Sequence, residues 1–343
     1  MAVIIPCAGR SSRFPGTRPK YLLTLYDGDT MFERTAKDYP NEDIHFIILE
    51  EHKDKYDASE AIYKAFKDRD NIFVHVLPKV TSGPAETVYM VTKHLKDQPI
   101  LIRDCDSFFD VPLKKTNHVC LADLRDNKSI TNVAAKSYAV LNDQDFITNI
   151  VEKTVVSNYI CVGGYGFESS DEFNQVFKRQ SKEFKGEIFI SHIIKDMLHT
   201  NTFEAEIVKN YIDCGTYDEF VRYNQSKPTI FCDLDGTVFL NQSRLFSNNY
   251  SNEPELMPNA AKYLLAKEKA GSKIIFTTSR PDEFADITIN ALNKAGFTNV
   301  NVLFNIPHAP RMVINDNSRT NPYPTALAMN VPRDDNEYWS KLL

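Results

Sequence analysis

The chain alternates between short apolar runs and longer stretches in which apolar residues recur every three or four positions. Runs with the length and the Ile and Val content of strands lie at 2–8, 44–50, 72–77 and 99–105. Stretches with helical periodicity lie at 54–67, 84–96, 170–181 and 188–199. This alternation predicts an α/β domain in which helices cover a mostly parallel sheet.

The same pattern restarts after the polar segment 223–228. The sequences TIFCDLDGT, KIIFTTSR and RMVINDNS each begin as a buried strand would, and amphipathic stretches lie between them at 258–270 and 282–296. We therefore predict a second, compact, doubly wound α/β unit with a parallel sheet. The predicted domains are 1–225 and 226–343.

With 343 residues, of which 42% are hydrophobic, the chain is long enough to form two cores. Its formal charge of -6, without a block of like charge, argues against nucleic acid and anionic membranes as partners. No stretch reaches the roughly 18 apolar residues of a membrane span, and the start lacks the features of a secretion signal. We expect a cytoplasmic protein that acts on small molecules.

The six cysteines are scattered, mostly in apolar runs, and no two of them form a CxxC pair. Free cysteine in such surroundings is usually a small core residue, so this interpretation is favoured over a metal site or a redox pair. A reducing compartment fits this use of cysteine.

A loop rich in small and basic residues follows the first apolar run. The sequence PCAGRSSRFPGTRPK at 6–20 carries Arg10, Arg13, Arg18 and Lys20. Backbone N–H groups in a small-residue turn, together with several cations, suit the binding of a triphosphate. The alternative interpretation is a surface loop with solvated cations.

Acidic residues stand where strands should end. Asp104 and Asp106 close the run PILIRDCD, and Asp213 lies in YIDCGTYDEF. Ligands of open α/β sheets bind at the carboxyl ends of strands, where two such carboxylates could hold one Mg²⁺ against phosphate oxygens. Taken singly, each of these residues could instead be a turn or capping residue.

At this point residues 1–223 resemble the sugar-phosphate nucleotidyltransferase family. The resemblance rests on motifs in order: AGRSSR with Lys20, SGPAETV, DCDSFF, Glu152-Lys153, GGYGF and DCGTYDEF. It implies a Rossmann-like mixed sheet similar to that of GT-A glycosyltransferases. One departure is Ser11, which stands where the usual loop pattern has a second glycine.

The resemblance also implies roles for individual residues. The nucleotide-binding residues would be Ala8, Gly9, Arg10 and Gly83, with Gly83 against the base. Arg13 and Lys20 would be catalytic and offset charge at the attacked α-phosphate. Asp106 and Asp213 would bind Mg²⁺. The acceptor would be bound by Glu152, Lys153, Gly164 and Glu187, with Lys153 on its phosphate. Catalysis would consist of positioning, charge neutralisation and in-line displacement of pyrophosphate.

A second set of motifs begins at TIFCDLDGTVF, where Asp233 and Asp235 end a predicted strand and share a face. Residues 228–343 resemble the haloacid-dehalogenase superfamily, without a large cap domain. The resemblance implies that Asp233 is the nucleophile and Asp235 the general acid/base. Thr278 and Arg311 would bind phosphate. Asp316 would complete a Mg²⁺ site with Asp233 and Asp235. The alternative is a structural DGT turn.

Together these resemblances predict a bifunctional enzyme. One domain would transfer a nucleotidyl group, with CTP favoured, from a nucleoside triphosphate to a sugar or polyol phosphate. The other would hydrolyse a phosphomonoester. The NPYPT segment after Asp316 resembles phosphatase-like proteins from surface-polysaccharide loci, which suggests activated capsule or lipopolysaccharide precursors. The chain could form a homodimer.

Two other functions stay open at this stage. The sequence DCD at 104–106 could be the metal-binding DxD of a nucleotide-sugar glycosyltransferase, although Arg13 and Lys20 favour a triphosphate. The second unit could also be an inactive docking or sensing module. Pyrophosphate release would separate the first alternative from nucleotidyl transfer, and phosphate release would test the second.

Overall fold

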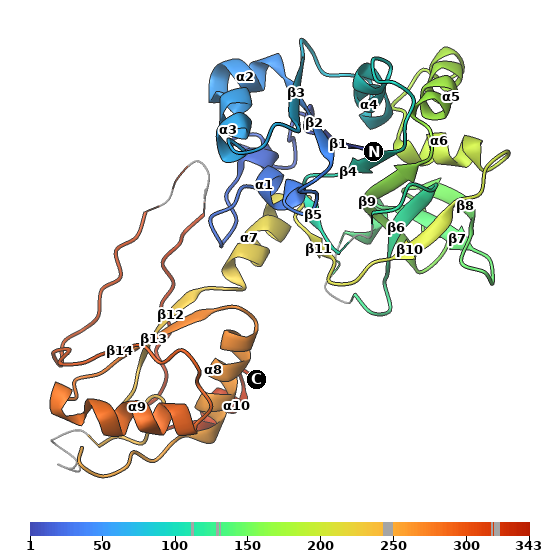
Figure 1. Ribbon diagram of the computed structural model, residues 1–343. Coiled ribbons are helices and arrows are strands. Elements are labelled where there is room, and N and C mark those ends of the chain that lie inside the picture. Colours follow the sequence, from blue (N-terminus) through green and yellow to red (C-terminus); the bar gives the residue numbers. More distant parts are fainter. Residues whose placement is uncertain (111–112, 128–129, 131, 243–249, 317, 319–322) are drawn as a thin grey trace. The chain divides into compact units, whose positions relative to one another are not determined.

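The computed structural model describes residues 1–110, 113–127, 130, 132–242, 250–316, 318 and 323–343 (Figure 1). The chain divides into two compact units, Met1–Phe220 and a second that begins at Val221. Among the described residues, no helix is both long and apolar enough to cross a membrane.

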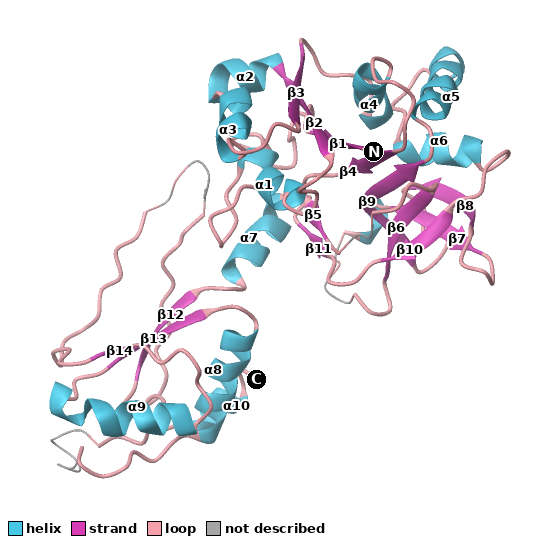
Figure 2. Cartoon of the chain, in the orientation of Figure 1, coloured by secondary structure: helices cyan, strands magenta, loops and turns pink. Residues whose placement is uncertain are grey.

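The first unit is built on a nine-stranded mixed sheet (Figure 2). Its strands are β1 Ala2–Pro6, β2 Asp43–Leu49, β3 Ile72–Leu77, β4 Ile100–Arg103, β6 His118–Asp123, β7 Ser137–Leu141, β8 Ile147–Glu152, β9 Tyr159–Phe167 and β10 Glu204–Ile207. Seven of them follow the order β10-β6-β9-β4-β1-β2-β3, while β7 pairs with β8 and β9. A separate antiparallel pair joins β5 Ser107–Phe108 to β11 Ile212–Asp213.

The first four predicted strands are confirmed as β1 to β4. These strands pair in parallel, with β1 between β2 and β4. Beyond β4 the direction changes, because β9 runs antiparallel to β4 and β6. The carboxyl ends of β1 and β4 therefore lie together at one edge, which carries both the basic loop and Asp104.

Helices cover both faces of this sheet. They are α1 Met31–Ala36, α2 Glu50–Tyr56, α3 Ala58–Ala65, α4 Pro84–Thr92, α5 Ser170–Glu183 and α6 Ile190–Met197, with 3-10 turns at Lys20–Leu22 and Val133–Ala135. Helix α7, Tyr217–Gln225, crosses the division between the units. The predicted helix at 54–67 is interrupted, because Asp57 adopts a left-handed φ of 51° between α2 and α3.

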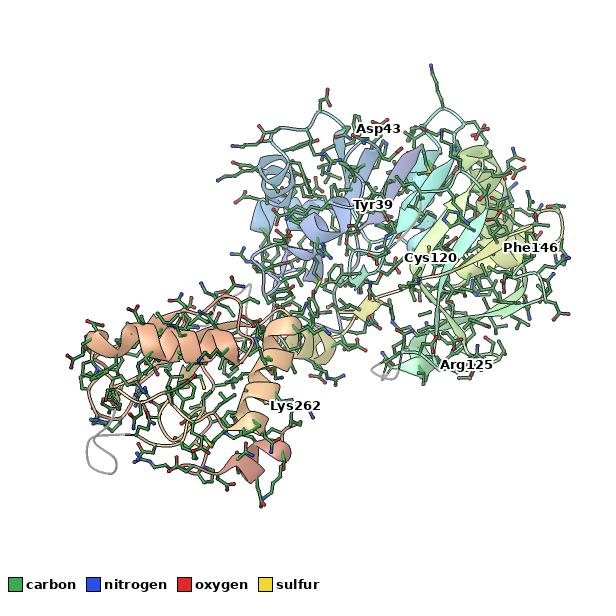
Figure 3. All side chains as sticks on the ribbon, turned by 60° about the horizontal axis from the view of Figure 1, so that its bottom comes forward. Tyr39, Asp43, Cys120, Arg125, Phe146 and Lys262 are labelled. Atoms are coloured by element: carbon green, nitrogen blue, oxygen red, sulfur yellow. The ribbon has the colours of Figure 1, made fainter. Side chains whose placement is uncertain are left out.

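The core lies on both sides of the sheet because alternate residues of a strand point to opposite faces. On β1, Ala2 and Ile4 belong to a cluster that includes residues of α4, α5 and α6. Val3 and Ile5 belong to a second cluster with residues of α1 and α3. Figure 3 draws these side chains, with Tyr39 and Cys120 labelled in the first unit. All six cysteines are buried free thiols, which confirms their interpretation as core residues.

The second unit has a parallel sheet in the order β12-β13-β14, formed by Thr229–Asp233, Lys273–Thr277 and Val302–Leu303. Its helices are α8 Pro258–Lys269, α9 Ala285–Lys294 and α10 Asn336–Ser340, with a 3-10 turn at Asp282–Phe284. The two predicted amphipathic stretches are confirmed as α8 and α9. Trp339 on α10 is buried, and its indole N–H donates to the Thr237 carbonyl at 3.1 Å.

One predicted strand of this unit is wrong. Residues 311–316 form no strand, and Met312 and Ile314 are 84% and 87% exposed. Within the described chain the segment pairs with no strand, and it packs these apolar side chains against little of the protein. The third strand is instead the short β14, and the fold of a haloacid-dehalogenase-type domain stays a prediction.

Candidate functional site

The carboxylates of Asp106 and Asp213 face the same small space in the first unit. Asp106 directly precedes β5, and Asp213 is the last residue of β11; Figure 1 labels both strands. In this antiparallel pair Asp213 lies opposite Ser107. The Cys214 amide donates to the Asp106 carbonyl at 2.8 Å. A Cβ added at Gly215 would lie 3.0 Å from Asp213 Oδ1 and 3.2 Å from Asp106 Oδ2. The structure thus brings together two acids that are separated by 107 positions in the numbering.

Three cations surround these carboxylates. The Lys20 ammonium forms an ion pair with Asp106, and the Lys136 ammonium forms one with Asp213. Arg13 Nη1 lies 3.7 Å from the position that a Cβ of Gly215 would take. Three cations and two carboxylates thus set the charge balance at this end of the sheet.

The ionisation of these groups reflects that balance. Burial by itself would raise the pKa of Asp106, but Lys20 more than offsets it, so the pKa lies below its ordinary value. Burial would likewise lower the pKa of Lys20, and Asp106 raises it. Asp104 is different, because burial and then the charge of Asp106 both raise its pKa. At neutral pH, Lys20 and Asp106 are therefore held charged.

The basic loop reaches this site through a left-handed turn at Ser11. Its φ is 49°, a conformation that glycine adopts without strain and serine adopts at some cost. The Ser11 hydroxyl accepts a hydrogen bond from the Lys20 amide at 3.0 Å, and its carbonyl accepts one from the Phe14 amide at 2.8 Å. The serine in place of glycine is thus accommodated, and its side chain fixes the backbone of Lys20.

Two clefts of the first unit have volumes of about 380 Å³ and 480 Å³, and the larger of the two borders the basic loop. This cleft, about 480 Å³, is lined by Arg10, Ser11 and Arg18 of the loop and by Lys79 before α4. Arg18 Nε is buried without a hydrogen-bond partner among the described residues. Two other residues of the loop were predicted to bind the nucleotide: Ala8 is buried and Gly9 is exposed. A cleft lined by three cations is suited to an anionic ligand.

Gly83 precedes α4 at a point of close backbone approach. A Cβ there would lie 2.8 Å from the Ile188 carbonyl oxygen, so only glycine fits without a shift of the backbone. The Glu187 Cγ would be 3.0 Å from the same Cβ. Glu187 therefore lies beside Gly83, the residue predicted to contact the base.

The predicted acceptor residues are held by contacts of their own. Glu152, at the end of β8, accepts a hydrogen bond from the Ser191 hydroxyl at 2.7 Å. Lys153 has a left-handed φ of 53°, and its amide donates to the Lys136 carbonyl at 3.1 Å. Its ammonium lies 4.2 Å from the centre of the Phe189 ring. Gly164 is buried, and the Cβ direction there is filled by Cys120, so it could contact a ligand only through its backbone.

In the second unit, Asp233 lies at the carboxyl end of β12 beside Arg311. Arg311 Nη2 donates to Asp233 Oδ1 at 2.9 Å, and the Thr237 hydroxyl donates to Oδ2 at 3.3 Å. Burial raises the pKa of Asp233, while Arg311 opposes that rise. Its side chain is still 35% exposed, which leaves it accessible to a ligand.

Asp235 is held more tightly than Asp233. Arg280 donates to its two carboxylate oxygens from Nε at 3.0 Å and from Nη2 at 2.7 Å. The Thr278 hydroxyl donates to Oδ2 at 3.0 Å. The Arg280 side chain is fully buried and that of Asp235 is 7% exposed, so this is a buried ion pair.

Asp316 is not gathered with these two acids. It lies on the exposed segment 311–316, where the described contact is from the Thr325 hydroxyl to its main-chain carbonyl. Across the described chain, no three His, Cys, Asp or Glu side chains form a group that could hold a metal ion. The predicted set of Asp233, Asp235 and Asp316 is therefore not assembled, because 311–316 is not a strand beside β12.

Sequence reasoning missed two cations at these sites. Arg280 stands two residues after Thr278, at the end of a predicted strand, and this position could have indicated a partner for Asp235. Lys136 had no such signal. It reaches Asp213 only because the residue that precedes β7 lies close to the end of β11 in the tertiary structure.

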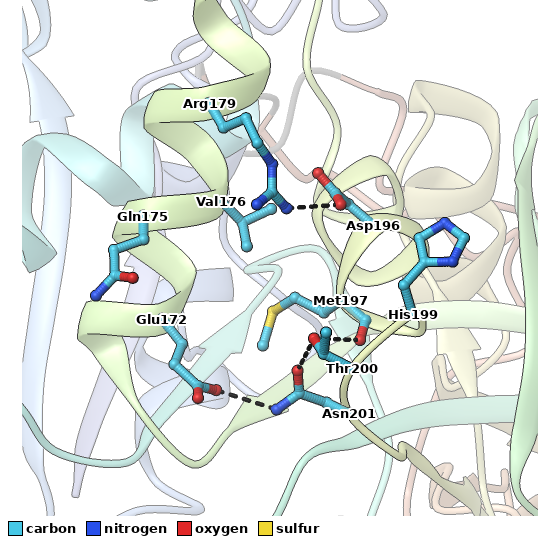
Figure 4. A pocket seen from close by; sticks show the side chains of 9 residues that line it. All are labelled: Glu172, Gln175, Val176, Arg179, Asp196, Met197, His199, Thr200 and Asn201. Carbon is cyan, nitrogen blue, oxygen red and sulfur yellow. Dashed lines mark hydrogen bonds and ion pairs between the residues drawn. The ribbon is translucent and has the colours of Figure 1, made fainter.

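The smaller cleft, about 380 Å³, lies between α5 and α6 (Figure 4). It contains none of the predicted site residues. Its charged side chains are paired with polar neighbours: Arg179 with Asp196 at 2.7 Å, and Glu172 with Asn201 at 3.1 Å. Such pairing leaves little charge for a ligand.

Comparison with solved structures places the fold of the first unit. Similar proteins are a nucleoside-diphosphate-sugar pyrophosphorylase from Vibrio cholerae RC9 (20% identity, TM-score 0.55, 65% of this chain and 99% of that chain) and a protein described as a glucose-1-phosphate thymidylyltransferase from Bacillus anthracis (18%, 0.56, 66% and 94%). A third is an inositol-1-phosphate CTP transferase from T. maritima (14%, 0.52, 64% and 90%).

These likenesses cover the N-terminal part of the chain and show its fold, a mixed α/β sheet of the type found in those nucleotidyltransferases. No family model matches the chain, and no curated protein matches its sequence. The activity of the chain must therefore be argued from its own residues.

Proposed function

We propose that the first unit is a nucleotidyltransferase, which transfers a nucleotidyl group from a nucleoside triphosphate to a sugar or polyol phosphate and releases pyrophosphate. The observation that carries this proposal is the meeting of Arg13, Lys20, Asp106 and Asp213 around Gly215, next to a cleft lined with cations. The fold is of the type found in nucleotidyltransferases, and it supports the same proposal.

The reaction needs little acid or base catalysis from the protein, because the acceptor phosphate is already an anionic nucleophile. One of its oxygens attacks the α-phosphorus, and the bond to the bridging oxygen of pyrophosphate breaks. Arg13 and Lys20 would offset the negative charge that repels the nucleophile and develops in the transition state. Arg10 and Arg18 would hold the outer phosphates, and Lys153 the acceptor phosphate.

Asp106 and Asp213 fit a Mg²⁺ ion. Mg²⁺ is commonly bound by one or two carboxylates together with substrate phosphates, and these two carboxylates both come within 3.2 Å of the position that a Cβ of Gly215 would take. Mg²⁺ bound there would neutralise phosphate charge and help to align the triphosphate. Residues 1–225 would thus supply the whole transferase site, with Ala8, Gly9 and Gly83 at the nucleotide and Glu152, Gly164 and Glu187 at the acceptor.

Pyrophosphate release from each of the four common nucleoside triphosphates, against a panel of sugar and polyol phosphates, tests this proposal. We expect release that requires both substrates and Mg²⁺, with CTP as the favoured nucleotide. Asp106→Asn should abolish it, whereas Asp54→Asn, an exposed acid on α2, should not. Glycosyl transfer without pyrophosphate release would instead indicate a nucleotide-sugar glycosyltransferase.

We propose a second activity, hydrolysis of a phosphomonoester, for residues 226–343. The support is the pair Asp233 and Arg311 at the end of a parallel strand, where an accessible carboxylate lies beside a cation that could bind phosphate. Asp233 would attack the phosphorus and form an aspartyl-phosphate, while the bond from phosphorus to the leaving oxygen breaks and Asp235 protonates that oxygen. Asp235 would then accept a proton from the water that attacks the aspartyl-phosphate, which releases phosphate and restores Asp233. Two linked activities would serve an activated precursor of surface polysaccharide.

In the described arrangement Asp235 is tied to Arg280, and Asp316 lies apart from the other acids. The proposed hydrolysis therefore rests on Asp233, Asp235 and Arg311. Asp233→Asn should abolish phosphate release from sugar phosphates and preserve pyrophosphate release. Glu283→Gln, an exposed acid of the same unit, is the matched control. Full pyrophosphate release with no phosphate release by the wild-type protein would indicate that the second unit is a docking or sensing module.

A further inference from the structure

Lys136 is a cation at the transferase site that no motif predicted, and it contacts two functional parts at once. Its ammonium pairs with Asp213 and also donates to the Tyr211 hydroxyl at 3.2 Å. Its carbonyl accepts the amide of Lys153, the residue assigned to the acceptor phosphate. Lys136 thus contacts both Asp213, a proposed Mg²⁺ ligand, and Lys153, a proposed acceptor-binding residue.

The ion pair lies in a place where it must compete with a metal ion. The side chains of Lys136 and Asp213 are 17% and 8% exposed, so water screens their attraction only partly. Asp213 Oδ1 is also engaged, because it accepts the Gly215 amide at 2.9 Å. A cation that binds Asp213 therefore competes with the ammonium at Oδ2.

The charge balance decides when this displacement is favourable. Asp106 and Asp213 carry two negative charges, and Lys20 and Lys136 neutralise both. A divalent cation that arrives alone adds two positive charges beside two ammonium groups, and the repulsion between them opposes binding. Nucleotide phosphates that arrive with the cation reverse this balance, because they offer the ammonium groups new anionic partners.

We propose that Lys136 guards the Asp213 carboxylate against free divalent cations and releases it only to a cation that arrives with nucleotide phosphates. The released ammonium stays close to Lys153, since the Lys136 backbone holds the Lys153 amide, and there it faces the acceptor phosphate. Lys136 is thus a positioning residue that acts through Asp213 and Lys153. This inference rests on the proposed transferase function for its purpose, but the competition itself can be measured without turnover.

The test measures the binding of Mn²⁺, as a stand-in for Mg²⁺, to the full chain without nucleotide. Electron paramagnetic resonance reports the concentration of the free ion during the titration. Lys136→Met removes the competing charge and keeps a side chain of similar length. We expect it to bind Mn²⁺ about tenfold or more tightly than the wild type, the factor that corresponds to about 1.4 kcal/mol. Structural damage would weaken binding instead, so a gain in affinity separates the two causes.

Three variants complete the test. Lys114→Met is the matched control, because Lys114 pairs with Glu204 and Glu206 in the same unit and should leave Mn²⁺ binding unchanged. Lys136→Arg keeps the charge and should stay weak like the wild type. The double variant Lys136→Met with Asp213→Asn should lose the gain.

Folding of each variant is checked by circular dichroism, and Lys136→Gln replaces the methionine variant if the latter unfolds. Equal Mn²⁺ affinity of the wild type and the neutral Lys136 variants would overturn the proposal, even if pyrophosphate release is normal. Absence of pyrophosphate release with every substrate would refute the transferase function, while the comparison of Mn²⁺ affinities would still decide the role of Lys136.

Discussion

Replacing Arg280 by methionine should strongly destabilise the second unit. Arg280 is fully buried and forms a two-pronged ion pair with Asp235, whose side chain is 7% exposed. Methionine fills much of the same volume, so the main loss is the charge rather than packing. The variant leaves Asp235 buried beside the Thr278 hydroxyl without its cation.

The expected magnitude follows from that burial. Removing one partner of a buried ion pair costs about 3–5 kcal/mol, because the other charge stays desolvated. A typical domain is stable by about 5–15 kcal/mol, so the loss is a large part of the total. Removing both charges, in Arg280→Met with Asp235→Asn, should restore some of this stability, since no isolated charge is left in the interior.

The single tryptophan of the chain provides the assay. Trp339 is 2% exposed in the second unit and packs against Tyr263 on α8, so its fluorescence reports unfolding of that unit. Urea unfolding followed by tryptophan fluorescence should show a lower midpoint for Arg280→Met. Without urea, Arg280→Met should release pyrophosphate like the wild type, because the transferase residues lie in the first unit.

A control pair on the surface sets the scale of the effect. Lys294 and Glu253 form an ion pair with side chains 69% and 60% exposed, and such pairs contribute about 0–1 kcal/mol. Lys294→Met should therefore change the free energy of unfolding little. If Arg280→Met shifted the tryptophan transition no more than Lys294→Met does, the reasoning from burial would be refuted.

Three further predictions concern the first unit. Burial lowers the pKa of His45 from 6.5 to about 4, so the unfolded chain binds more protons than the folded chain between these pH values. The first unit should therefore lose up to about 3 kcal/mol of stability as the pH falls from 6.5 to 4. His45→Phe should flatten this pH dependence in acid titrations of unfolding. Ser11→Gly should keep most of the pyrophosphate release, because glycine adopts the left-handed φ without strain. Ser11→Val resists that φ and loses the hydrogen bond from the Lys20 amide, so it should reduce the rate at least about tenfold. Equal rates for the two variants would contradict the role of the Ser11 turn in placing Lys20. Gly83→Ala should lower the thermal midpoint by the equivalent of about 1–3 kcal/mol, because its Cβ would meet the Ile188 backbone, and a midpoint equal to that of the wild type would show that the loop shifts freely.

Local patterns were sufficient for four strands of the large sheet and for two helices of the second unit, but they did not predict β6 to β10. The strands β1 to β4 and the helices α8 and α9 lie where the spacing of apolar residues predicted them, because burial of one or both faces imposes a period on the sequence. The same reasoning failed at 311–316. Its apolar residues have the composition of a strand, but a strand also needs a partner in a sheet, and composition does not record whether one is within reach.

The candidate sites divide in the same way. The sequence by itself determined the loop with Arg13 and Lys20 and the acids at strand ends, since these follow from the order of residues around each strand. Only the tertiary structure decided that Asp106 and Asp213 share one space, that Lys136 neutralises Asp213, and that Arg280 fixes Asp235. The physical reason is that an ion pair depends on distance through space, and distant segments meet only when the chain folds.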